Sequence, residues 1–351
     1  MNLTAEEFIR LANNFYNANN QATDLNRIAL DSHLFNFING NAGKLKKFKV
    51  AFCCICLNGY YWEFIKPMIQ GAKQFFLPGH DIDFFLWSDI PSNFEPSSLD
   101  KAIEKLQTIK DDRKNAYSDG VNDGLLKGLE VLQKESRKMY GATIFPTEAQ
   151  PWPLPTLMRY HLFLQQEEIL KDYDYIFYCD VDMKFVNVVG DEILGIGLTA
   201  ALHPGYATDK KLWPPYEPNK DSHSFIQRPG MVIQDEGKPR FMPMYFAGGL
   251  QGGKSDKFIS AMKAMKNLID KDMAIGYTPI WNDETAWNKY LEKTPLDTIV
   301  LPPSYIYPDS LIEEYYVPKV WGVRYPPKLI TLTKKFSVSP EGGAAVAKMI
   351  Q

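Results

Sequence analysis

Cysteine and long apolar runs are both scarce in this sequence of 351 residues. No window approaches the roughly 20 apolar residues that a membrane-spanning helix needs, and the first residues, "MNLTAEEFIRLANNFYN", are amphipathic rather than an apolar signal. Three of the four cysteines lie inside one apolar run, so a disulfide framework and a zinc-thiolate site are both disfavoured. These absences predict a cytosolic protein without a membrane partner.

A marked excess of charge of either sign is also missing. Lysine and arginine total 39 and aspartate and glutamate total 42, which leaves a formal net charge of −3. This balance argues against a nucleic-acid partner. The 45% apolar content is sufficient for a sizeable core, so we expect one large domain or two modest ones and a neutral or locally neutralised ligand.

The apolar pattern after residue 46 indicates an α/β protein. "KVAFCCICL" is a nearly continuous apolar run, which is typical of a parallel strand buried on both faces. A segment with helical spacing, "YYWEFIKPMIQGAKQFF", and a second strand, "IDFFLWSD", follow it. Further along, "MRYHLFLQQEEILKDYD" predicts a helix that leads into the strand "YIFYC".

Three segments fall outside this pattern. Residues 1–45 are typical of polar helices and would form an appendage for packing or oligomerisation. Residues from about 97 to 140 form a charged, helix-prone insertion, and residues 336–351 form a C-terminal tail. The main domain should therefore span residues 46–335, interrupted by the insertion.

Two carboxylates, Asp180 and Asp182, stand where the strand "YIFYC" stops. Open α/β sheets hold their ligands at such carboxyl ends of strands. The pair could cap a turn. It could be a phosphatase nucleophile and acid, but that chemistry expects a small hydroxyl residue downstream, where "MKF" stands. It could also hold Mg²⁺ or Mn²⁺, with waters and substrate phosphates completing the coordination.

The stretch "GGLQGGKS", residues 248–255, satisfies the pattern of a phosphate-binding loop. Such a fold places its Mg²⁺-holding acid on a later strand, whereas Asp180 lies about 70 residues earlier. The lead-in "RFMPMYFA" contains Pro243 and would make a poor central strand. We therefore favour a structural glycine turn over a nucleotide-triphosphatase loop.

A third cluster is "WNDETAWNKYL", residues 281–291. Asp283 and Glu284 stand between two tryptophans, which suits a sugar site, since indole faces stack on a pyranose while carboxylates hold hydroxyls or attack carbon. The same residues could simply begin a helix, with Asn282 as cap and the acids favoured by the helix dipole. Both interpretations can hold together.

In this order, "YCDVDMKF", "LHPGY", "YFAGGLQGG" and "WNDETAWNKYL" resemble the motifs of glycosyltransferase family 6, the retaining histo-blood-group A/B and α1,3-galactosyltransferase family. The resemblance extends from about residue 47 to residue 310. It implies a GT-A-type nucleotide-sugar-binding α/β fold with a mixed, mostly parallel sheet. It also implies transfer of galactose or N-acetylgalactosamine from UDP to a galactoside, usually with Mn²⁺.

The resemblance gives each matching residue an expected role. Asp180 and Asp182 would bring Mn²⁺, or alternatively Mg²⁺, to the UDP diphosphate. Glu284 would be the catalytic residue at the anomeric carbon, and Asp283, paired with Arg159, would bind donor-sugar hydroxyls. The other implied donor contacts are Cys56, Leu57, Tyr61, Ala247, Gly248, Gly249 and Asn282, and the implied acceptor contacts are His203, Gly205 and Trp281.

In the family that the sequence resembles, the positions matched by Ala247 and Gly249 lie beside the 2-substituent of the donor sugar. Both residues are small and would leave this space open, so we expect UDP-N-acetylgalactosamine to be preferred over UDP-galactose. Gly205 would leave room for a branch on the acceptor glycan, such as fucose. The sequence thus predicts a cytosolic, metal-dependent, retaining α1,3-glycosyltransferase. The alternatives are a phosphate-loop nucleotidase and a non-catalytic sugar-binding protein with the same fold.

Overall fold

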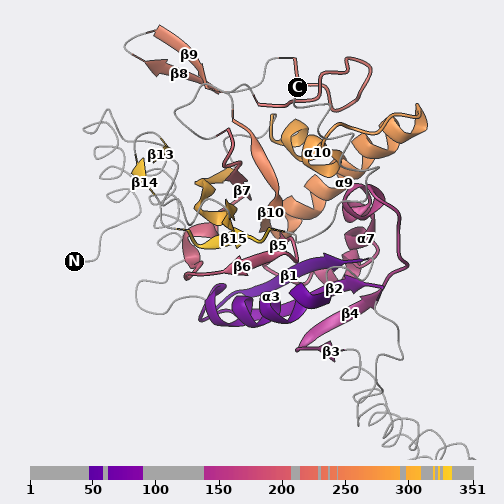
Figure 1. The fold of residues 1–351 in the computed structure, drawn as a ribbon, viewed down its shortest axis with the longest axis vertical. Helices are drawn as coiled ribbons and strands as arrows, with labels where there is room; N and C mark the ends of the chain where they lie inside the picture. Colours follow the sequence, from indigo (N-terminus) through magenta and orange to yellow (C-terminus); the bar gives the residue numbers. More distant parts are fainter. Residues whose placement is uncertain are drawn as a thin grey trace, which may run out of the picture.

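The computed structural model describes residues 47–57, 62–89, 138–206, 214–227, 231–235, 238–242, 244–292, 298–309, 319–320, 323–324 and 327–333. Residues 1–45, almost all of the insertion and residues 336–351 lie outside the described residues, as does Tyr61. An eight-stranded sheet organises the described chain, in the order β11-β7-β10-β5-β1-β2-β4-β3 (Figure 1). Its strands in chain order are β1 (Lys49–Cys56), β2 (Asp81–Ser88), β3 (Lys138–Met139), β4 (Ala142–Pro146), β5 (Tyr175–Cys179), β7 (Leu198–Leu202), β10 (Phe246–Lys254) and β11 (Thr298–Leu301).

The first half of the sheet is parallel, as the apolar runs predict. β1 pairs in parallel with β2 on one side and with β5 on the other, and β2 pairs in parallel with β4. All residues of β1 after the first are buried, because helices or loops cover both faces of the sheet. Helix α3 (Trp62–Phe75) makes the crossover from β1 to β2. The prediction of an α/β fold with a mixed, mostly parallel sheet is confirmed.

Strand β10 runs against this direction, antiparallel to both β5 and β7. It contains most of "GGLQGGKS", so the predicted glycine turn is wrong: the stretch is a central strand that begins after Pro243. A Cβ on Gly252 would lie 2.5 Å from the Ile176 carbonyl oxygen, and one on Gly253 would lie 2.4 Å from the Gly197 carbonyl oxygen. These glycines are needed for close strand packing, which also excludes a phosphate-binding loop here.

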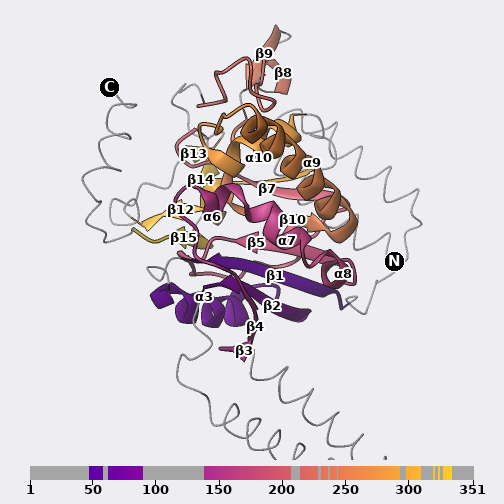
Figure 2. The ribbon, with the colours of Figure 1, turned by 90° about the vertical axis from the view of Figure 1, so that its right-hand side faces the viewer.

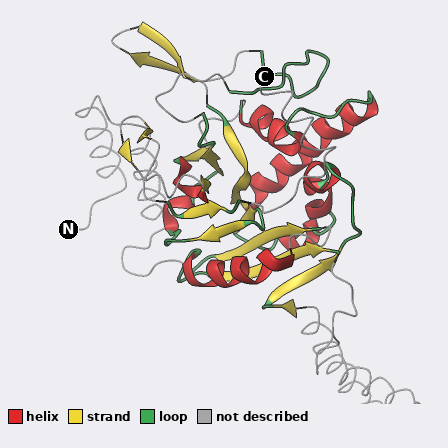
Figure 3. Ribbon diagram, viewed as in Figure 1, coloured by secondary structure: helices red, strands yellow, loops and turns green. Residues whose placement is uncertain are grey.

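Each face of the sheet has its own apolar core. Figure 2 shows helices on both sides of the sheet. On one face α3 packs with β6 (Met183–Phe185) and contributes Ile65, Met68 and Ile69 to the core. On the other face lie α7 (Arg159–Leu164), α9 (Ser255–Ala274) and α10 (Asn282–Leu291) (Figure 3). Burial of these two apolar faces holds the helices against the sheet.

Short elements complete the described chain. The helix expected before β5 is split into α7 and α8 (Glu167–Leu170), with α6 (Leu154–Leu157) just before them. A three-stranded sheet joins β6 to β15 (Leu329–Thr331) and β12 (Tyr307–Pro308). The remaining elements are the 3-10 helices η1 (Asp191–Ile193) and η3 (Pro303–Tyr305) and the pairs β8 (Met231–Asp235) with β9 (Lys238–Met242) and β13 (Lys319–Val320) with β14 (Val323–Arg324).

Candidate active site

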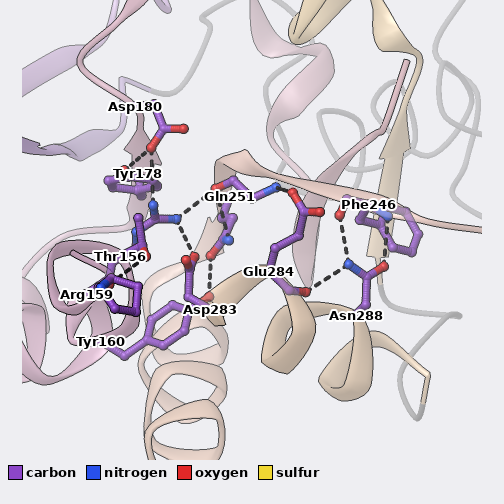
Figure 4. Close-up of polar contacts among 12 residues, drawn as sticks. Thr156, Arg159, Tyr160, Tyr178, Asp180, Phe246, Gln251, Asp283, Glu284 and Asn288 are labelled. Carbon is purple, nitrogen blue, oxygen red and sulfur yellow. Dashed lines mark hydrogen bonds and ion pairs between the residues drawn. The ribbon is translucent and has the colours of Figure 1, made fainter. Parts of the chain in front are cut away.

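Arg159, the first residue of α7, connects the elements of the site (Figure 4). Its Nη1 donates to the Gly248 carbonyl at 2.9 Å and forms an ion pair with Asp283 Oδ2 at 2.6 Å. Its Nη2 donates to Asp180 Oδ1 at 3.2 Å. The guanidinium lies over the Tyr178 ring, 3.9 Å from its centroid. One buried cation therefore links β5, β10 and α10.

The two acids of "DVD" follow β5 directly, as predicted, but their surroundings differ. The Asp180 side chain is 37% exposed and accepts a hydrogen bond from the Tyr178 hydroxyl. Asp182 is buried, and its carbonyl accepts the Leu332 N–H at 2.9 Å. No cluster of three or more His, Cys, Asp or Glu side chains is placed to hold a metal ion in the part of the chain that the structure describes.

This donor set fits a hard divalent cation that shares its coordination with a ligand. Mg²⁺ and Mn²⁺ prefer oxygen ligands, and Mg²⁺ usually binds through one or two carboxylates plus waters and substrate phosphates. Asp180 and Asp182 supply two carboxylates at the carboxyl end of β5, where such a ligand would sit. The acids therefore suit a metal that arrives with a diphosphate.

A register shift in β10 exposes the backbone of the glycine motif to the site. Phe246 pairs with Leu202 of β7, but Gln251 already pairs with Ala200, so the residues between them bulge out of the ladder. The Gly248 carbonyl is thereby available to Arg159, and the Gly248 N–H donates to Glu284 Oε2 at 2.7 Å.

The two central glycines face different partners. A Cβ on Gly248 would lie 3.2 Å from Glu284 Cβ and 3.6 Å from Asp283 Oδ2. A Cβ on Gly249 would lie 2.8 Å from Asp180 Oδ2 and 2.8 Å from Ile306 Cδ1. The space beside Gly249 is therefore not open, contrary to the reasoning from residue size alone, because the Asp180 carboxylate occupies it.

Asp283 and Glu284 occupy the first turn of α10, where the helix dipole favours acids. Burial raises the pKa of Glu284 to about 6, while the Tyr245 hydroxyl and the Gly248 N–H lower it. Burial also raises the pKa of Asp283, and the Arg159 guanidinium opposes that shift. Both acids are thus poorly hydrated, as acids with catalytic roles often are.

The interpretation in which Asn282 caps the N-terminus of α10 is wrong. The capping position is Trp281, without a side-chain cap, and Asn282 is the first helical residue with φ of 52°. Trp281 is 40% exposed, so its indole can meet a ligand. Asn288, one turn beyond Glu284, exchanges hydrogen bonds with both backbone groups of Phe246 at 2.8 Å and so fixes α10 against β10.

The predicted acceptor residue His203 follows β7 and lies in an aromatic cluster with Tyr206, Tyr216 and Tyr245. Its ring centroid is 5.0 Å from that of Tyr206 and 5.8 Å from that of Tyr245. Burial lowers the pKa of His203 to about 4, so the ring is neutral at pH 7. Its Nδ1 accepts the Gly205 N–H at 3.1 Å.

The remaining predicted donor contacts lie around the strand ends. Cys56 is the last residue of β1, and both it and Leu57 are buried, as is Ala247 at the start of β10. The Cys56 carbonyl accepts the Ser88 hydroxyl at 2.8 Å. These placements are compatible with a nucleotide at the β1 end but leave the uridine contacts a prediction.

Several polar residues of the site were missed by the sequence reasoning. The Tyr160 hydroxyl donates to Gln251 Oε1 at 2.8 Å, and Gln251 Nε2 donates to the Gly248 carbonyl at 3.1 Å. The Tyr178 hydroxyl donates to the carboxylate of Asp180, and the Tyr245 hydroxyl lowers the pKa of Glu284. Only their positions beside motif residues could have drawn attention to them, because the contacts depend on strand register and on the bulge in β10.

The chain is similar to known glycosyltransferases. A model described as "Glycosyltransferase family 6" matches residues 155–325. The rat "Histo-blood group ABO system transferase 1" is 28% identical over 252 residues, which cover 72% of this chain and 59% of that protein. The "Globoside alpha-1,3-N-acetylgalactosaminyltransferase 1" of dog is 26% identical over 252 residues with the same coverage, and that of human is 24% identical over 254 residues, again with the same coverage.

These relatives overturn one prediction. They are lumenal transferases of the Golgi, so the expectation of a cytosolic protein, which rested on the scarcity of apolar runs, is wrong. Among the described residues, none of the helices has the length and apolar character to cross a bilayer. The chain spans about 59% of the length of these relatives.

The matching family model, these relatives and the α/β fold with its "DVD" acids and Asp283–Glu284 pair point the same way. The chain is similar to glycosyltransferase family 6.

Proposed function

We propose that the chain is a retaining hexosyltransferase that moves N-acetylgalactosamine, or galactose, from a UDP-sugar to the 3-hydroxyl of a galactoside, which forms an α1,3 linkage. The observation that carries the proposal is the Glu284 carboxylate, held by the Gly248 N–H at 2.7 Å beside the buried pair of Arg159 and Asp283. A nucleotidase is not supported, because the stretch that resembles a phosphate loop is strand β10.

The site has two acidic clusters, Asp180 with Asp182 and Asp283 with Glu284, and each cluster has its own role. Mn²⁺ or Mg²⁺ at Asp180 and Asp182 would neutralise the negative charge of the UDP that leaves. Arg159 holds Asp180 and Asp283 at fixed positions between the two clusters. Asp283 is then oriented to accept hydrogen bonds from hydroxyls of the donor sugar.

Glu284 acts at the anomeric carbon of the donor. Retention of configuration proceeds either through a covalent glycosyl-Glu284 or through a front-face displacement beside the ionised carboxylate. In the covalent route a Glu284 oxygen bonds to the anomeric carbon while the bond between this carbon and UDP breaks. The acceptor hydroxyl then attacks the same carbon, displaces Glu284 and loses its proton. Both routes require Glu284 to be ionised.

The donor preference for N-acetylgalactosamine is part of the proposal. It is supported by the names of the globoside relatives, which are N-acetylgalactosaminyltransferases, and by the small residue Ala247. Open space at Gly249 does not support this preference, because the side chains of Asp180 and Ile306 occupy the space that a Cβ on Gly249 would enter. A galactoside, either unbranched or with a fucose branch as in blood-group glycans, is the proposed acceptor, with Trp281 and His203 as its aromatic contacts.

The test is hydrolysis and transfer of isotope-labelled UDP-N-acetylgalactosamine and UDP-galactose, with and without Mn²⁺. We expect slow hydrolysis of the donor, faster turnover with a galactoside, and loss of turnover in Glu284→Ala with UDP binding retained. Glu292→Ala, which removes an acid just past the end of α10, is the control and should behave as the parent. Binding of sugars without turnover of either donor would instead identify a non-catalytic sugar-binding protein.

A further inference from the structure

Gln251 is a fully buried amide in the middle of strand β10. Its cross-strand partners, Tyr178 of β5 and Ala200 of β7, both belong to the apolar core on the face of α7, α9 and α10. Burying an amide among apolar side chains costs free energy unless both its ends form hydrogen bonds. An apolar residue would avoid this requirement, so the polar side chain calls for a reason beyond packing.

Both ends of the amide form hydrogen bonds, and only one orientation allows this (Figure 4). Gln251 Nε2 donates to the Gly248 carbonyl at 3.1 Å, and Gln251 Oε1 accepts the Tyr160 hydroxyl at 2.8 Å. A carbonyl can only accept, so the amide nitrogen must face Gly248 and the tyrosine must donate. Burial raises the pKa of Tyr160 well above its ordinary value, so the hydroxyl keeps its hydrogen for this bond.

The carbonyl that Gln251 holds belongs to the residue beside Glu284. Gly248 lies where the pairing of β10 with β7 is interrupted, so side chains serve its backbone groups instead of a neighbouring strand. Its carbonyl accepts both Gln251 Nε2 and Arg159 Nη1, and its N–H donates to Glu284 Oε2 at 2.7 Å. Glycine has no side chain to restrain its backbone, so these hydrogen bonds set how Gly248 is turned.

We propose that Gln251 is a positioning residue: it holds the Gly248 carbonyl so that the N–H of the same residue stays directed at Glu284 and fixes this carboxylate toward the anomeric carbon. Tyr160 acts through Gln251 by holding the other end of the amide. The inference rests on the proposed function, since it gives Glu284 the role at the reacting carbon. Arg159 restrains the carbonyl less, because the same Nη1 also forms the ion pair with Asp283.

The activity test uses Gln251→Met, which keeps the length of the side chain and removes both hydrogen bonds. It should lower kcat by about tenfold to a hundredfold with little change in UDP binding, because a displaced Glu284 affects the reacting carbon and not the nucleotide. The matched control is Thr199→Val on β7, which removes a buried hydrogen bond of 2.8 Å to the Ile193 carbonyl and should keep the kcat of the parent. Parent kcat in Gln251→Met, or an equal loss in both variants, would overturn the proposal.

A double variant separates positioning from stability. In Gln251→Met the Tyr160 hydroxyl loses its acceptor, which should lower the midpoint of denaturant unfolding. Tyr160→Phe combined with Gln251→Met removes that hydroxyl as well, so the midpoint should recover while kcat stays low. Recovery of kcat together with the midpoint would show that Gln251 only supports packing, and the proposal would fail.

A spectroscopic measurement does not depend on turnover. Isotopic labelling of glycine nitrogen and alanine carbonyl carbon selects, by NMR, the amides of Ala-Gly pairs, of which the sequence has two, Ala42 with Gly43 and Ala247 with Gly248. The signal that remains in Ala42→Ser belongs to Gly248. A hydrogen bond to a carboxylate moves an amide proton downfield, so Glu284→Gln supplies the reference for a weakened bond.

In Gln251→Met the Gly248 proton should move from its parent position toward this reference, whereas in Thr199→Val it should stay. An unmoved signal in Gln251→Met would reject the positioning role. A parent that turns over no UDP-sugar, but whose Gly248 signal responds to Gln251→Met as expected, would reject the proposed function and leave the contact standing.

Discussion

Arg159 and Asp283 form an ion pair of 2.6 Å in which both side chains are almost fully buried, at 4% and 5% exposure. A buried pair contributes little net stability compared with apolar residues, but removing one partner leaves a charge without compensation. Here the same guanidinium also holds Asp180 and the Gly248 carbonyl. The pair therefore links the stability of the domain to the geometry of its site.

Arg159→Ala should destabilise the protein by about 3–5 kcal/mol, because Asp283 would remain buried without its cation. The free energy of unfolding from denaturant titration measures this. The double variant Arg159→Met with Asp283→Leu should lose much less than the sum of the single losses, since it removes both charges. Additive losses would show that the two side chains do not depend on each other.

Asp182→Asn should weaken Mn²⁺ binding in the presence of UDP and raise the Mn²⁺ concentration needed for half-maximal turnover, by about tenfold or more. A neutral amide replaces a carboxylate as ligand of a hard cation beside a diphosphate. Calorimetry of Mn²⁺ with UDP gives a readout separate from activity. Asp81→Asn, on an exposed acid paired with Lys47, serves as control. Parent-like Mn²⁺ affinity in Asp182→Asn would remove the metal role from this acid.

Gly249→Ala should reduce turnover of both UDP-sugars together instead of changing their ratio, because the new Cβ would lie 2.8 Å from Asp180 Oδ2. Specificity constants for the two donors decide the matter. Gly71→Ala is a suitable control, since its Cβ would meet Phe185 Cβ at an ordinary 3.4 Å within helix α3. A changed donor ratio at full activity would place Gly249 beside the 2-substituent after all.

His203 should make the fold less stable in acid. Its pKa is lowered by burial to about 4, against about 6.5 in an unfolded chain, so between these values the unfolded state binds a proton that the folded state does not. This contribution is fully present above pH 6.5 and is lost as the pH falls toward 4, with a slope of at most about 1.4 kcal/mol per pH unit. His203→Gln, measured by denaturant unfolding at several pH values, should show a shallower decline than the parent. Parallel curves would mean that His203 titrates alike in both states.

The sequence was sufficient for the parts of the molecule that follow local rules. β1, β2 and β5 could be predicted because strands buried on both faces are continuously apolar, and the place of Asp180 followed from the end of β5. The start of α10 was also predicted, since two acids suit a helix N-terminus.

What could not be predicted depends on residues distant in the sequence. Arg159 reaches Gly248, which is 89 residues away, and nothing near either residue encodes that contact. Strand β10 was mistaken for a turn because its glycines serve close packing between strands, which composition alone does not distinguish from a turn. The filled space at Gly249 likewise depends on where Asp180 lies.

The two halves of strand β10 should respond differently when a glycine is replaced by a residue with a side chain. At Gly252 and Gly253 a side chain would meet backbone atoms within 2.5 Å, whereas at Gly248 the nearest atoms belong to the Glu284 side chain at 3.2 Å. A mutational scan along the strand should therefore give two phenotypes: loss of soluble protein at its far end and altered catalysis with intact folding near Gly248. Nine consecutive residues would thus hold both a rigid support and a segment in which substitutions act on the Glu284 side chain.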